Sequence, residues 1–75
     1  MDDLHKLHKI HSWMWEIDKK YPTMPMSDEA WSEIIDGCDA LVTELELEPG
    51  CYARRLLYVW RTLKEDLHTQ AMLAA

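Results

Sequence analysis

The clearest structural signal in the sequence lies between Ser27 and Leu45, S-D-E-A-W-S-E-I-I-D-G-C-D-A-L-V-T-E-L. The apolar residues of this stretch recur at spacings of three and four, in the heptad order a, d, e, a, d, e, a. This spacing places them on one face of an α-helix, whereas a half-buried strand would alternate. The residues on that face are Trp31, Ile34, Ile35, Cys38, Leu41, Val42 and Leu45.

The start of this helix has its own signals. Ser27 is a good N-cap residue, and Met26 and Trp31 occupy the positions of a hydrophobic staple. Gly37 lies in the helix interior, where glycine costs up to ~1 kcal/mol relative to alanine. We expect it to allow the close approach of a neighbouring helix.

Two proline-containing breaks divide the rest of the chain. Pro22 and Pro25 mark the first, and Pro49-Gly50 marks the second. The segments between them predict helices over about 3–20, 28–47 and 51–72. The expected apolar stripe of the first helix is Leu7, Ile10, Met14, Ile17 and Tyr21.

The third helix has two stripes. We expect its apolar stripe to be buried, namely Tyr52, Leu56, Val59, Trp60, Leu63 and Leu67. The second stripe is mostly basic and is expected to face outward: Arg54, Leu57, Arg61, Lys64 and His68. Tyr58 stands beside Arg54 and Arg61 at helical spacings of four and three.

Three apolar stripes joined by short connections predict an all-α chain, a single helical domain over 1–75 that forms an antiparallel three-helix bundle. The rival architecture is a long hairpin of the second and third helices that dimerises, with the first helix packed across it. Surplus apolar surface favours a homodimer, because these residues do not all fit one small core: Trp13, Trp15, Leu57, Tyr58, Met72 and Leu73.

Charge is distributed unevenly along the chain. The net charge is −6, and residues 22–50 contain eight acids and no base. Nucleic-acid binding depends on neutralising phosphates, so this balance does not favour it. A basic protein surface is the expected partner.

Several functional classes lack their sequence signals. Gly37 and Gly50 are too far apart for a phosphate-binding loop, and the longest apolar runs have five residues, too short for a membrane span. The acidic start predicts no secretory signal. Cys38 and Cys51 without such a signal predict a reducing, cytoplasmic location.

Metal and catalytic chemistry are weakly indicated. His5, His8 and His11 recur at spacings of three, but this spacing drifts around a helix and does not direct three imidazoles to one ion. Cys51 at a helix start has no base near it in sequence. We therefore predict no metal, no cofactor and no enzymatic activity.

The functional class that remains is a protein that binds other proteins. Tryptophan, tyrosine and arginine, the residue types that dominate binding hot spots, support this class. The prediction is a protein-binding module, an acidic inhibitor or adaptor for a basic protein surface. The alternative is a nucleic-acid-binding regulator using the third helix. The partner-binding candidates are Glu29, Glu33, Asp36, Asp39, Glu44, Trp13, Trp15, Arg54, Tyr58 and Arg61.

The whole chain resembles the small, acidic, helical accessory proteins of phages and mobile elements of Gram-positive bacteria. The features behind the resemblance are its size, the Met1-Asp2-Asp3 start, the acids from Asp28 to Glu48 and the Trp-rich helices. Such sets include inhibitors of host defence such as anti-CRISPR proteins, some of which present carboxylates where DNA would bind. Such sets also include many proteins of no known role, and the resemblance assigns a role to no particular residue.

Overall fold

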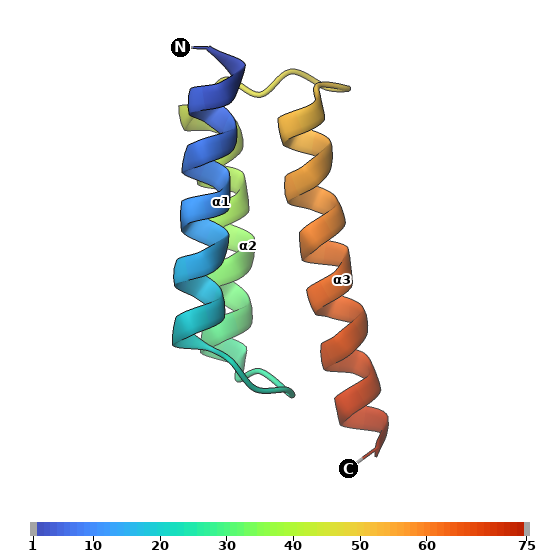
Figure 1. Cartoon of the computed structure of the whole chain (residues 1–75). Helices are drawn as coiled ribbons and strands as arrows, with labels where there is room; N and C mark the ends of the chain where they lie inside the picture. Colours follow the sequence, from blue (N-terminus) through green and yellow to red (C-terminus); the bar gives the residue numbers. More distant parts are fainter. Residues whose placement is uncertain (1, 75) are drawn as a thin grey trace.

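The computed structural model describes residues 2–74, which form three helices and no strand. They are α1 (Asp3–Lys20), α2 (Asp28–Glu44) and α3 (Tyr52–Ala74). Figure 1 shows that the chain reverses direction at each of the two connections, 21–27 and 45–51. The molecule measures 43 × 22 × 16 Å. The prediction of an all-α chain with three helices is confirmed.

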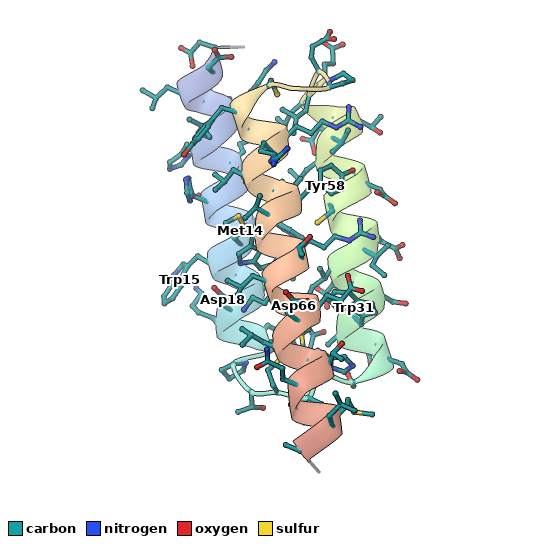
Figure 2. The ribbon with its side chains drawn as sticks, turned by 90° about the vertical axis from the view of Figure 1, so that its right-hand side faces the viewer. Met14, Trp15, Asp18, Trp31, Tyr58 and Asp66 are labelled. Atoms are coloured by element: carbon teal, nitrogen blue, oxygen red, sulfur yellow. The ribbon has the colours of Figure 1, made fainter. Side chains whose placement is uncertain are left out.

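The third helix packs against both of the others. Figure 2 views the molecule from the side of α3, which lies in front, between α1 and α2. The core is therefore a thin layer beneath α3. Its buried residues are Ile10, Ile17, Met26, Ala30, Ile34, Cys38, Leu41, Leu45, Leu47, Ala53, Leu57 and Trp60.

The first two helices bury the faces that their spacing predicts. Ile10 and Ile17 of α1 are buried, and so are Ile34 and Cys38 of α2. The predicted N-cap is also present, because the Ser27 hydroxyl accepts a hydrogen bond from the backbone N–H of Ala30 at 3.1 Å. The apolar period predicts both helices, and the capping residue Ser27 predicts the start of α2.

The second helix ends at Glu44, earlier than the predicted boundary at 47. The reason is a Schellman motif: the backbone N–H of Leu47 donates to the carbonyl of Val42, and that of Glu46 donates to Thr43. Glu46 takes the left-handed position, with φ of 52°. This turn brings one more apolar side chain, that of Leu47, into the core.

The predicted orientation of α3 is wrong. Leu57, expected to face outward, is fully buried, while Tyr52, Val59 and Leu63, expected to be buried, are 69%, 55% and 53% exposed. Trp60 is buried as predicted. The helix presents Ala53, Leu57 and Trp60 to the core instead.

The long basic residues on this inward side of α3 find partners on other parts of the chain. Lys64 forms an ion pair with Asp18 of α1, and the Arg54 guanidinium donates to the carbonyl of Leu47 at 3.2 Å. Their aliphatic stems can pack against the core while their charged ends are satisfied. The mostly basic stripe of α3 can therefore face the core, because its charged groups have partners there.

Candidate functional site

Beyond Asp28 at its first position, the outer face of α2 carries three acids that have no ion-pair partner within residues 2–74. Glu29, Asp36 and Asp39 are exposed, and none of them forms an ion pair within residues 2–74. They begin in the first turn of the helix and continue for about three turns. We refer to these three residues as the acidic face.

Glu33 lies on the side of α2 that meets α1, where its carboxylate is engaged. Lys20 Nζ lies 3.0 Å from Glu33 Oε1, and the Tyr21 hydroxyl donates to Oε2 of the same carboxylate. The hydrogen bond from Tyr21, followed by the contact with Lys20, lowers the pKa of Glu33. Its charge therefore stabilises the chain itself.

Glu44 is the second predicted acid that α1 reaches. Lys9 Nζ lies 3.6 Å from Glu44 Oε1, and the two side chains are 42% and 61% exposed. An exposed pair of this kind contributes little to stability, about 0–1 kcal/mol. It does reduce the negative potential along this edge, so the unneutralised charge is concentrated on the acidic face.

The arginines of α3 do not neutralise the acidic face. The guanidinium groups of Arg54 and Arg61 each lie 5.8 Å from the ring centre of Tyr58, one turn away on either side. All three residues are half-buried. Tyr58 thus lies between two cations, as the sequence spacing predicts. All three residues of this cluster lie on α3, apart from the acidic face.

The two tryptophans proposed as partner-binding residues differ in environment. Trp13 is half-buried and makes an edge-to-face contact with Trp60, with ring centres 5.4 Å apart. Trp15 is 61% exposed and projects from the outer side of α1 in Figure 2, with Lys19 5.7 Å from its ring centre. Only Trp15 offers most of its surface to another molecule.

The histidines of α1 lie at solvent-exposed positions and are not gathered with other ligand side chains among the described residues. His5, His8 and His11 are all exposed, and no three histidine, cysteine or acidic side chains within the described residues are grouped to hold a metal ion. In the same part of the chain, none of the helices has the length and apolar character needed to cross a bilayer.

The two cysteines differ in accessibility. Cys38 is fully buried, and its burial raises the pKa of its thiol to about 11. Cys51 is half-buried at the start of α3, where its sulfur accepts a hydrogen bond from the backbone N–H of Arg54 at 3.5 Å. Cys51 therefore acts as the N-cap of α3.

His68 is an important residue that the sequence interpretation placed on the outward face of α3. Its Nδ1 accepts a hydrogen bond from the backbone N–H of Met26 at 2.9 Å. Its ring stacks on Trp31, with ring centres 6.1 Å apart and planes 4° apart. Through these two contacts, His68 links α3 to the connection 21–27 and to α2. No sequence signal indicated this role, because the partners are more than 35 residues away.

A second surface lies on the outer side of α3 and was not expected from the sequence. It consists of the apolar stripe that was predicted to be buried: Tyr52, Leu56, Val59, Leu63 and Leu67. We refer to these five residues as the outer stripe. Leu56 is half-buried and the other four are exposed.

Comparisons with family models, with curated proteins and with solved structures found no match to this chain.

Proposed function

We propose that this chain is a non-enzymatic protein-binding module, an acidic inhibitor or adaptor that engages a basic protein surface. The acidic face of α2 supports the proposal, because Glu29, Asp36 and Asp39 have no ion-pair partner within residues 2–74. The nearby lysines of α1 are committed to Glu44 and Glu33 instead.

The helix holds these carboxylates in fixed positions. Spacings of seven and three residues place Glu29, Asp36 and Asp39 along one side of a rigid element. A row of like charges steers a basic partner towards the face and selects its orientation, which raises the association rate more than the affinity. We expect binding that weakens strongly with salt.

The nucleic-acid alternative gains little support from the basic residues of α3, because Arg55 alone among them is exposed. Lys64 is paired with Asp18, and Arg54 donates to the carbonyl of Leu47. Arg61 is half-buried beside Tyr58. These cations are engaged within the chain, whereas contacts to phosphates would need them free.

A pull-down with the immobilised chain tests the proposal. We expect a basic partner to be retained at about 0.05 M salt and released at about 0.5 M, because screening shortens the range of the charges. Changing Asp36 and Asp39 to lysine should abolish retention. Changing Glu65 of α3 to lysine is the matched control and should leave it intact, because that exposed acid lies outside the acidic face.

Two results would contradict the proposal. One is retention that is insensitive to salt and to the changes at Asp36 and Asp39. The other is direct, salt-sensitive binding of bare DNA or RNA by the purified chain, which would favour the nucleic-acid alternative.

A further inference from the structure

The outer stripe of α3 is most open at its centre, whereas Leu56 packs against the core and Tyr52 lies beside the start of α1. The outer stripe extends from Tyr52 to Leu67, about 22 Å along the helix axis. Val59 and Leu63 at its centre are more than half exposed. Single exposed apolar side chains are ordinary, but a continuous stripe is typical of a binding surface.

A groove beside the centre of the stripe carries opposite charges at its two ends. It is lined by Arg55, Tyr58, Val59, Thr62, Leu63 and Asp66. Arg55 and Asp66 are 11 positions apart, about 16 Å along the helix. Both side chains are exposed, and neither forms an ion pair within residues 2–74. Figure 2 shows Asp66 on the side of α3 that faces the viewer.

We propose that α3 pairs with α3 of a second copy of this chain, in antiparallel orientation, about a two-fold axis midway between Arg55 and Asp66. In this arrangement Arg55 of each copy lies opposite Asp66 of the other. The symmetry makes the contact twice, as in a closed dimer whose two patches are identical. Val59 and Leu63 of both copies meet between the two ion pairs.

The charges select this orientation over the parallel one. A parallel pair of α3 helices would place Arg55 against Arg55 and Asp66 against Asp66. Like charges facing one another across a helix pair are unfavourable, and they are a common device for excluding a wrong orientation. The apolar stripe supplies the affinity in either orientation, so the two charged residues decide between them.

The proposed dimer does not depend on the proposed function. The dimer uses α3, whereas the acidic face lies on α2, so each can fail alone. A dimer with its two α3 helices in contact would leave both acidic faces accessible. The chain would then present two copies of the acidic face to its partner.

A charge-swap series measured by sedimentation equilibrium tests the dimer. We expect wild type to change from monomer to dimer with concentration. Arg55→Glu should weaken dimerisation about tenfold or more, because it places two acids together at both ends. Asp66→Lys should do the same with two bases. The double variant Arg55→Glu/Asp66→Lys should recover to within about threefold of wild type, because the opposite pairs are restored.

Two further variants test the apolar part of the interface. Leu63→Gln should weaken the dimer about tenfold or more, and since the side chain is exposed the helical circular dichroism should not change. Leu4→Gln, which changes a still more exposed leucine on α1, is the control and should dimerise like wild type. A monomer at every concentration would overturn the proposal. So would a double charge swap as weak as either single swap, because only the antiparallel pairing predicts rescue.

Discussion

Trp13 occupies the space that a side chain at Gly37 would need. The indole Cε2 lies 2.8 Å from the position of a β-carbon at residue 37, and Nε1 lies 3.1 Å from it. The glycine expected to allow a close helix approach instead admits a single aromatic ring, which also contacts Trp60. The contact explains why α2 retains a glycine in its interior despite the cost in helix propensity.

Gly37→Ala should therefore destabilise the chain. The gain of up to ~1 kcal/mol in helix propensity is outweighed by displacement of the ring, and we expect a net loss of about 1–3 kcal/mol in the free energy of unfolding. Urea denaturation followed by circular dichroism measures the change. In a Trp13→Leu background the same substitution should be neutral or stabilising. A loss of equal size in that background would contradict the account.

Glu33→Gln should make the free energy of unfolding less dependent on pH between pH 7 and pH 3. The pKa of Glu33 is lowered by the hydrogen bond from Tyr21 and by Lys20. Its contribution is therefore fully present above the ordinary value of 4.5 and is lost as the pH falls through the lower folded value. The difference in unfolding free energy between wild type and variant should shrink from pH 7 to pH 3.

Glu65→Gln provides the control for this pH series. Glu65 is exposed on α3 and makes no ion pair within the described residues. Its variant should follow the wild-type pH profile. If Glu33→Gln also followed the wild-type profile from pH 7 to pH 3, the cluster of Glu33, Tyr21 and Lys20 would contribute nothing to stability.

Glu46→Gly should stabilise the end of α2. Glu46 has φ of 52°, a left-handed conformation that costs a residue with a β-carbon about 1 kcal/mol or more. Glycine removes this cost but adds freedom to the unfolded chain, so we expect a net gain of about 0.5 kcal/mol. Thermal unfolding gives the measurement. Glu48→Gly, two residues on and without a positive φ, should give no gain.

The thiols should react at very different rates. Iodoacetamide at pH 8 should modify Cys51 and leave Cys38 unmodified, since Cys38 is fully buried and its pKa is raised to about 11. Mass spectrometry should show one modification in the folded chain and two in denaturant. The Cys51→Ser variant should remain unmodified while folded. Rapid modification of that variant would show that Cys38 is accessible.

The helices of α1 and α2 could be predicted because each has one clearly apolar face and recognisable boundary residues, such as Ser27. The orientation of α3 could not be predicted, because either of its two stripes, the apolar one or the mostly basic one, can face the core. Leu57 and Trp60 fill the core only if Lys64 and Arg54 find partners. Those partners, Asp18 and the carbonyl of Leu47, come from other parts of the chain and become neighbours only after folding.

The candidate site was predictable to a similar degree. Composition located the acids on the second helix, and helical spacing placed Tyr58 between two arginines. Which acids stay unneutralised depends on where Lys9 and Lys20 of α1 reach across to α2. The sequence alone gives no distance between those helices, so Glu33 and Glu44 could not be separated from Asp36.

The orientation of α3 exposes the outer stripe and brings Lys64 and Arg54 to partners within the chain, so the proposed surfaces depend on it. Paired urea denaturation of Leu57→Ala and Leu63→Ala, at protein concentrations low enough to keep both monomeric, tests it most directly. Leu57→Ala should lose about 2–5 kcal/mol in unfolding free energy, as expected of a fully buried leucine. Leu63→Ala should lose less than about 1 kcal/mol, as expected of an exposed one. The reverse order, with the larger loss at Leu63, would show that α3 packs with its other face and would contradict the account.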